Sequence, residues 1–452
     1  MRILKTALLP LPLLALANFA WAAGAAKDSA APSLDPNRII NESYGFLKNR
    51  EPEMTATEYA LYDKVVSLIA ARPEYAMKLL ETMMGDKTPA SPAFEFVLGN
   101  AHYATGKHEL AITHYRRAVE KYPDFLRAWT NLGITCYAAG RHAEAVPCFN
   151  KALSLGDRAA STYGLLGYCL AKADNPLAAE MAYLQAFALD PDNPDWIQAL
   201  AQLLVGTKQY ARAEALVRQL IRLKPAESHN WMLHATILIA QERRIDAIAV
   251  LETATRLGAL SNAGQLALGD LYAEQGFHAE AVTTYRATME NAPDAGAQRL
   301  LRFAQSLIAT RKLSEAQRVL DTAPAAASRD TKVLYWETKA ALSFANKDHS
   351  GARQALESVL ELETLNGRAL LGLGELHASG GNPTKARLLY EQASQLPAFA
   401  YQANLELASL ALDAKDPRKS AAHLRTALSL QRSPALQDYL ARVSALVPSD
   451  EN

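Results

Sequence analysis

A 34-residue period is the feature that most constrains how this 452-residue chain can fold. In the segment LRAWTNLGITCYAAGRHAEAVPCFNKALSLGD, numbered with Leu126 as position 1, small residues stand at positions 8, 15, 20 and 27, and aromatic residues at 4 and 24. Related residues return at most of these positions one period earlier and in four later units, without a slip from residue 92 to 295. The small residues at position 8 are Gly99, Gly133, Gly167, Ala201, Ala235 and Gly269.

Each unit is predicted to form a helical hairpin. Positions 4, 7, 8 and 11 fall on one face of a first helix, and positions 20, 24 and 27 fall on one face of a second helix. Small residues at positions 8 and 20 let the two helices approach closely. Gly at 15 suits the turn, and Pro near 32 ends the second helix. Because one hairpin cannot bury its apolar face alone, neighbouring hairpins must stack. The sequence therefore predicts an all-α solenoid.

The pattern continues in weaker form on both sides of the regular array at residues 91–295. In residues 296–432 the register shifts by one residue in the seventh unit and by two more in the eighth, and the ninth unit returns to form. We expect residues 55–90 to form a degenerate amino-terminal hairpin, with two amphipathic helices split by Pro73. Residues 433–452 are expected to supply a capping helix and a tail, since a repeat array needs a cover for its last apolar face.

The first 22 residues have the features of a secretory signal peptide. Arg2 and Lys5 form a charged start, an apolar run broken by two prolines follows, and small residues stand before the expected cut after Ala22. Residues 23–54, with several Pro, Asn and Ser, are predicted to be an irregular leader or linker. We expect the mature protein to be soluble and periplasmic.

Charge and motifs argue against several classes of function. The 47 basic and 47 acidic side chains balance, so the chain has no general attraction for nucleic acid. No later segment is apolar enough to span a membrane. Phosphate-binding, zinc-binding and nucleophile motifs are all missing from the sequence, so we expect neither an enzyme nor a cofactor or metal site. Cys136, Cys148 and Cys169 are expected to be small apolar residues of the core, with one disulfide as the alternative.

The repeat resembles the tetratricopeptide repeat (TPR) family, whose 34-residue signature is W-x2-L-G-x2-Y, then A-x3-F, then Ala and Pro. This resemblance implies a right-handed superhelix of stacked hairpins. It also implies a concave groove that holds a protein or peptide partner, lined by positions 2, 5, 9 and 12 of the first helices. The groove residues carried over in this way are Phe96, Asn100, Tyr103, Arg127, Thr130, Tyr137, Tyr168 and Gln202. Packing within the array is the alternative role for the tyrosines.

A narrower resemblance concerns residues 56–300. The runs FEFVLGNAHYATGKHELAITHYRRAVEKYPDFLRAWTNLGI and STYGLLGYCLAKADNPLAAEMAYLQAFALDPDNPDW look like periplasmic TPR proteins encoded beside ExbB, ExbD and TonB. It implies a partner among these TonB-type components and support of energy transduction for transport. Two alternatives remain: a scaffold or chaperone for cell-wall or polysaccharide export assembly, and a cytoplasmic adaptor if the leader is not cleaved.

Overall fold

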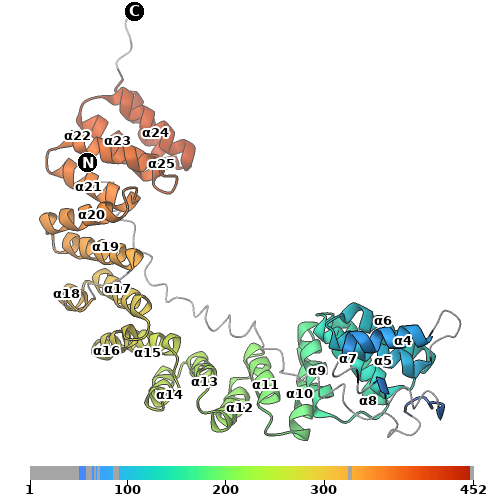
Figure 1. Ribbon diagram of the computed structural model, residues 1–452. Helices are drawn as coiled ribbons and strands as arrows, with labels where there is room; N and C mark the ends of the chain where they lie inside the picture. Colours follow the sequence, from blue (N-terminus) through green and yellow to red (C-terminus); the bar gives the residue numbers. More distant parts are fainter. Residues whose placement is uncertain are drawn as a thin grey trace, which may run out of the picture. The chain divides into compact units, whose positions relative to one another are not determined.

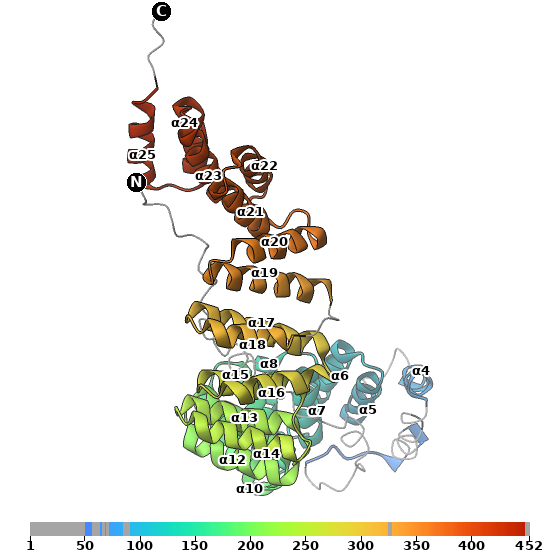
Figure 2. The same ribbon diagram turned by 90° about the vertical axis from the view of Figure 1, so that its left-hand side faces the viewer.

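The computed structural model of the protein describes residues 50–56, 64–65, 68, 72–84, 91–323 and 328–447. In these residues the regular structure is helical throughout, and Figures 1 and 2 show the helices following one another as hairpins. The chain divides into two compact units, residues 19–260 and residues 261–452, which are described separately. The predicted signal peptide and most of the predicted leader lie outside the described residues.

Five hairpins make up most of the amino-terminal unit, preceded by the helix α4 (Pro73–Met84). Their first helices begin at residues 92, 126, 160, 194 and 228, so the structure follows the predicted period. Within the unit each helix packs against the next one along the chain. The hairpins are α5 (Pro92–Ala104) with α6 (His108–Lys121), α7 (Leu126–Ala138) with α8 (His142–Ser154), α9 (Ala160–Lys172) with α10 (Pro176–Leu189), α11 (Pro194–Gly206) with α12 (Tyr210–Leu223), and α13 (Ser228–Ala240) with α14 (Arg244–Arg256).

The carboxyl-terminal unit repeats this design less regularly. Its second hairpin has a first helix of 17 residues and a second helix of 9, and the next first helix again has 17 residues. These changes fall where the sequence register shifts. The helices are α15 (Asn262–Glu274) with α16 (His278–Met289), α17 (Pro293–Ala309) with α18 (Leu313–Asp321), α19 (Arg329–Ala345) with α20 (His349–Leu362), α21 (Gly367–Ser379) with α22 (Pro383–Ser394), α23 (Ala400–Asp413) with α24 (Pro417–Leu430), and the final α25 (Pro434–Ser444).

The turn inside each hairpin requires one residue with a left-handed backbone. Glycine supplies it in four hairpins, for example Gly140 with φ 74°. In the other six a non-glycine residue adopts the same conformation, for example Glu242 with φ 63°. Such a φ is uncommon for residues with a side chain, so the stacked helices impose it. The six residues are Asp174, Lys208, Glu242, Arg311, Lys347 and Lys415.

The core of a hairpin is built around position 8 of its first helix and position 24 of its second. Where position 8 is glycine, position 24 is an aromatic ring that lies directly on it: a Cβ at Gly133 would be 2.7 Å from Cε1 of Phe149. The same close approach joins Gly99 to Tyr115, Gly167 to Tyr183, Gly269 to Tyr285 and Gly374 to Tyr390. In the other five hairpins Ala stands at position 8, and Val or Leu takes the place of the ring at position 24. In the five hairpins with glycine at position 8, the predicted close approach is therefore made by the aromatic ring at position 24, which packs against the backbone of the first helix at position 8.

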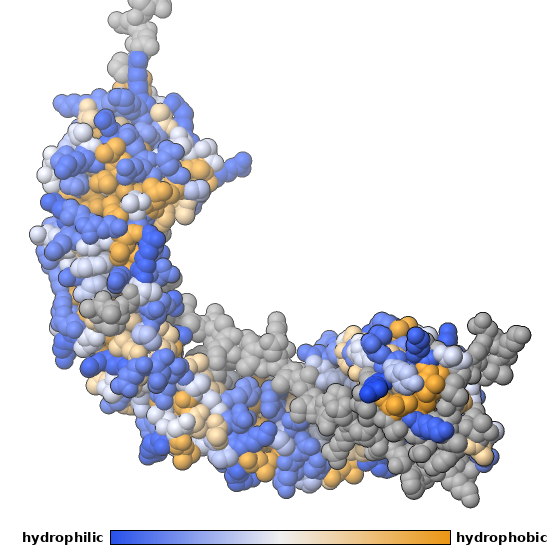
Figure 3. All heavy atoms as spheres, viewed as in Figure 1, coloured by the Kyte–Doolittle hydropathy of each residue, from blue (hydrophilic) through white to orange (hydrophobic). Residues whose placement is uncertain are grey.

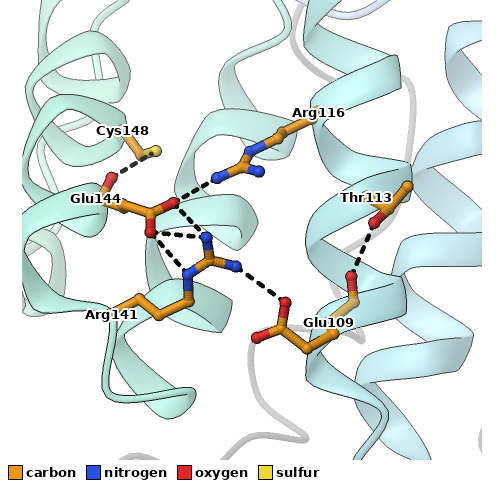
Figure 4. Close-up of polar contacts among 6 residues, drawn as sticks. All are labelled: Glu109, Thr113, Arg116, Arg141, Glu144 and Cys148. Carbon is orange, nitrogen blue, oxygen red and sulfur yellow. Dashed lines mark hydrogen bonds and ion pairs between the residues drawn. The ribbon is translucent and has the colours of Figure 1, made fainter.

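Ion pairs join second helices of successive hairpins in the amino-terminal unit. Figure 4 shows Arg141, at the start of α8, reaching back to Glu109 of α6 at 2.9 Å while its Nε donates to Glu144 at 2.8 Å. Arg116 of α6 also pairs with Glu144. Such exposed pairs contribute little stability each, about 0–1 kcal/mol. They link α6 to α8, the second helices of two successive hairpins.

The last helix of the array is packed on one side, and the three cysteines lie in the core. The last helix α25 packs on α24 and buries Leu436 and Val443. All three cysteines are buried and free of disulfides. Figure 3 shows hydrophilic and hydrophobic residues interspersed on the face in view. Among the helices that the structure describes, none is both long enough and apolar enough to cross a bilayer.

Candidate functional site

An aromatic strip runs along the first three hairpins of the amino-terminal unit. It comprises the rings of Tyr103, His108, Tyr137, His142 and Tyr168. The first two tyrosines occupy position 12 of successive hairpins and are half-buried. Each contacts the histidine that begins the following helix, with ring centroids 5.5 Å apart for Tyr103 and His108 and 6.1 Å apart for Tyr137 and His142.

Tyr168 of α9 joins the second hairpin to the third within this strip. Its ring stands edge-on to Tyr137 at 5.3 Å and to His142 at 5.4 Å. The Nζ of Lys172 lies 5.4 Å from the centre of the Tyr168 ring, within the range of a cation–π contact. Tyr168 itself is only 7% exposed. It therefore supports the strip from below, and Tyr103 and Tyr137 offer the more accessible surface.

Two tyrosines and one histidine of the strip are held in neutral form near pH 7. Burial raises the pKa of Tyr103, and burial together with the neighbouring Tyr168 raises the pKa of Tyr137. Burial and the charge of Lys172 lower the pKa of His142. The phenols keep their protons and this imidazole stays uncharged. These positions thus present flat, uncharged rings that can also hydrogen-bond.

The predicted groove residue Phe96 lies in the core instead, so this part of the prediction is wrong. It is 4% exposed, and its ring contacts Tyr115 at 5.9 Å and Phe125 at 4.9 Å between centroids. The cause is Phe125, which precedes the first helix of the next hairpin and closes over position 5.

Asn100 is also buried, because position 9 serves the hairpin core. Its Oδ1 accepts hydrogen bonds from the hydroxyl of Tyr115 at 2.6 Å and from Nδ2 of Asn131 at 3.0 Å. In the sixth hairpin Asp270 accepts the hydroxyl of Tyr285 at 2.8 Å in the same way. A buried tyrosine at position 24 needs such an acceptor. Asn100 is thus unavailable as a groove contact.

Arg127 and Thr130 of α7 have partners within the chain. Nε of Arg127 lies 2.9 Å from a carboxylate oxygen of Glu51, and the amide of Leu126 donates to the carbonyl of Arg50. The segment just before the predicted hairpin therefore covers the start of α7. Thr130 donates to Asp157 at 3.1 Å, which ties α7 to the approach to α9.

Gln202 of α11 is 5% exposed, so it too belongs to the packed interior. Its Oε1 accepts no hydrogen bond from the part of the chain that the structure describes. Of the four aromatic residues among the predicted groove positions, Tyr103 and Tyr137 are the two whose rings are only half-buried and reach the surface. Whether they contact a partner stays a prediction.

Sequence reasoning missed the two histidines of the strip. His108 and His142 stand at position 17 of successive hairpins, and His278 holds this position in the sixth. This recurrence was the available signal, because a position that returns once in each period lies on one edge of the stack. In both His108 and His142 the Nδ1 atom is buried, with no hydrogen-bond partner among the described residues.

Hairpins of two helices that stack one on the next along the chain define a helical-repeat protein. Family models for the tetratricopeptide repeat match residues 96–162, 170–237, 232–296 and 338–403, which together make up more than half of the chain. The chain therefore belongs to the tetratricopeptide repeat family. Proteins of this family are typically non-enzymatic scaffolds for protein–protein interaction, and we assign this coarse role to the chain.

Individual proteins are similar over parts of the chain. A putative cellulose synthase operon protein C from Escherichia coli O157:H7 is 25% identical over 214 residues, which is 47% of this chain and 16% of that protein. The match thus spans about a sixth of that relative's length. The structure of MamA is 20% identical, with a TM-score of 0.36, over 36% of this chain and 90% of MamA. That of the TPR protein YrrB is 16% identical, with a TM-score of 0.36, over 46% of this chain and 97% of YrrB. The family assignment rests on the repeat models.

Proposed function

We propose that the protein is an exported, periplasmic scaffold that binds a protein or peptide partner along the aromatic strip and assembles a complex of the cell envelope. The observation that carries this proposal is the repetition of Tyr103 and Tyr137 at one place in successive hairpins, each backed by a histidine ring. The amino-terminal signal features support export, since such segments direct chains out of the cytoplasm.

The strip suits a partner for physical reasons. Tyrosine offers a large, rigid contact area at little cost in conformational entropy, and a few such residues usually carry most of the binding energy. Because the rings of Tyr103 and Tyr137 are already packed on one side, they lose little freedom on binding. Their uncharged state favours an extended or helical segment with apolar side chains and free peptide groups.

For the particular complex we favour polysaccharide export. The supporting observation is the similarity to the putative cellulose synthase operon protein, which is weak in identity and partial in length. The TonB-linked role implied by the narrower resemblance stays a prediction, which the similarity to the cellulose synthase operon protein does not support. The identity of the captured partner distinguishes polysaccharide export from the TonB-linked role.

The test is comparative capture from the envelope fraction of the source organism, with mass spectrometry. The variant carrying Tyr103→Ala and Tyr137→Ala should lose about 2–4 kcal/mol of binding free energy, the range of typical hot spots. Its melting temperature should change little, because both rings are partly exposed. A control variant carries Glu120→Ala and Asn150→Ala, two exposed positions on second helices.

The outcome tests both the binding surface and the identity of the envelope complex. A partner retained by the control and lost by the tyrosine variant supports the strip, and a polysaccharide synthesis or export component would support the specific role. Capture of an ExbB, ExbD or TonB component would instead support the TonB-linked role. Equal capture by all three proteins would refute the strip as the binding surface.

A further inference from the structure

The helix α10 carries an apolar seam on its exposed side. Leu177, Met181, Leu184 and Ala188 follow one another at spacings of four, three and four residues, so they line one side of the helix. Leu177 is 78% exposed and Met181 is 70% exposed, the two highest values among the large apolar side chains of the described residues. Leu184 is half-buried and Ala188 is exposed. Because α10 packs on α9 and α11, the apolar seam lies on the side that faces away from them.

The outer side of α10 is thus nearly as apolar as its inner side. Glu180 and Gln185 are the only charged or amide side chains among its 14 residues, and Glu180 pairs with Arg212 of α12. The helix α12, which has the same place in the next hairpin, contains four charged side chains in the same length. It carries Arg218 and Arg222 where the apolar seam of α10 ends. A helix that is apolar all round is normally covered on all sides, and a contiguous exposed apolar patch marks an interaction site.

The spacing and surroundings of the apolar seam suit a second helix. Alternating spacings of four and three residues are those of a coiled-coil seam, which packs against another helix. The helices on either side of α10 leave room for it, because small exposed residues take the places of Leu177 and Met181 there. These small residues are Ala143 and Pro147 of α8 and Ala211 and Ala215 of α12.

The charge pattern of α10 argues for a second copy of the chain as the occupant. An anionic membrane surface attracts helices rich in Lys and Arg, and α10 has neither. A charged partner helix would bury its charges against the apolar seam without compensation. A second copy supplies the same uncharged seam, and homodimer interfaces are the more apolar class.

We propose that the protein forms a two-fold symmetric dimer in which α10 packs antiparallel on α10 of a second copy. Leu177 then faces Ala188 of the second copy, so a large side chain meets a small one, and Met181 faces Leu184. The contact is isologous and closes on itself, as a two-fold interface requires. None of the seam residues belongs to the aromatic strip, so one dimer presents two strips to partners.

The test measures the mass of the purified protein by analytical ultracentrifugation. Chain concentrations of about 1–100 μM suit the small interface that one pair of helices makes. Met181→Lys and Met181→Glu each place a charge in the apolar seam, and because this side chain is exposed, both variants should melt like the native protein. The control is Leu388→Lys on α22, at the equivalent place of the ninth hairpin and 57% exposed. Leu388 belongs to no apolar seam, since Thr384 and Glu391 stand beside it on the same side of α22.

We expect the native protein and the control to approach twice the mass of one chain as the concentration rises. Each Met181 variant alone should need at least about tenfold more protein to dimerise, because like charges then meet close to the two-fold axis. An equimolar mixture of the two variants should recover the dimer, since a lysine of one copy then lies near a glutamate of the other. The proposal is overturned if the native protein stays monomeric, if either Met181 variant dimerises as the native protein does, if the control loses the dimer, or if the mixture stays monomeric.

Discussion

Replacing Gly133 with alanine tests how the hairpin core is built. The new Cβ would lie 2.7 Å from Cε1, 2.8 Å from Cδ1 and 3.0 Å from Cζ of Phe149. Normal contact is about 3.5–4.0 Å between carbon atoms, so the ring must move by roughly an ångström. Because Phe149 is fully buried, that movement strains its other neighbours. Phe149→Leu should relieve the clash, as the Ala201 and Val217 pair of the fourth hairpin indicates.

The expected free energies follow from these contacts. Overpacking of a core costs about 1–3 kcal/mol. The better helix propensity of alanine offsets about 1 kcal/mol of this cost, so Gly133→Ala should destabilise the hairpin by up to about 2 kcal/mol. Phe149→Leu alone leaves part of the ring volume empty and should cost roughly 1–2 kcal/mol. In the double variant the two effects should cancel in part, with a coupling free energy of about 1–2 kcal/mol.

Native-state hydrogen exchange with mass spectrometry is the suitable assay, because unfolding of a repeat array is not a single two-state event. We expect the opening free energy of α7 and α8 to fall in each single variant, with smaller losses in the neighbouring hairpins. The double variant should lose less than the sum of the two. Additive losses, within about 0.5 kcal/mol, would refute direct contact between the glycine and the ring.

Three further predictions concern the turns, a buried carboxylate and export. A Cβ would meet open space at both Gly140 and Gly206, but only Gly140 has a positive φ. Gly140→Ala should therefore destabilise its hairpin by about 1 kcal/mol, and Gly206→Ala should stabilise its hairpin by about 0.4–1 kcal/mol. Hydrogen exchange measures both effects. Burial opposes ionisation of Glu95, yet hydrogen bonds from His114 and Lys121 prevail and lower its pKa below 4.5. Thermal melts should therefore show Glu95→Gln less stable than the native protein at neutral pH, by about 1–3 kcal/mol, with the difference vanishing as pH falls through the lowered pKa. Intact mass of the protein from fractionated cells should correspond to a start at Ala23, and a full-length cytoplasmic chain would contradict export.

The sequence was sufficient to predict the hairpins, because their determinants are local and repeated. Spacings of three and four residues define helix faces, and a fixed period places the same face in each hairpin. Position 8 was predicted to be a close contact, and the Gly133 contact with Phe149 has that form. What the pattern did not specify is the left-handed backbone of Glu242, since no local feature of a glutamate favours it.

The site was harder to predict, because it depends on contacts between hairpins. A helical stripe gives the direction of a side chain, but the next hairpin decides whether solvent reaches it. Phe96 and Asn100 stand at positions of the expected stripe, yet the ring of Phe125 packs on Phe96, and Asn131 of the next hairpin hydrogen-bonds to Asn100. Conversely, His142 is unremarkable on its own helix and gains its place in the strip through Tyr168 of the following hairpin.

Site-specific photo-crosslinking at Tyr137 tests most directly whether a partner binds the aromatic strip. A photoreactive phenylalanine analogue replaces Tyr137 in one protein and Asn150, on the second helix of the same hairpin, in another. We expect irradiation of living cells to crosslink a protein partner from position 137 and to give no such product from position 150. Crosslinking to the same partner from position 150 alone would show that the partner binds the second helices, and it would contradict the assignment of the aromatic strip.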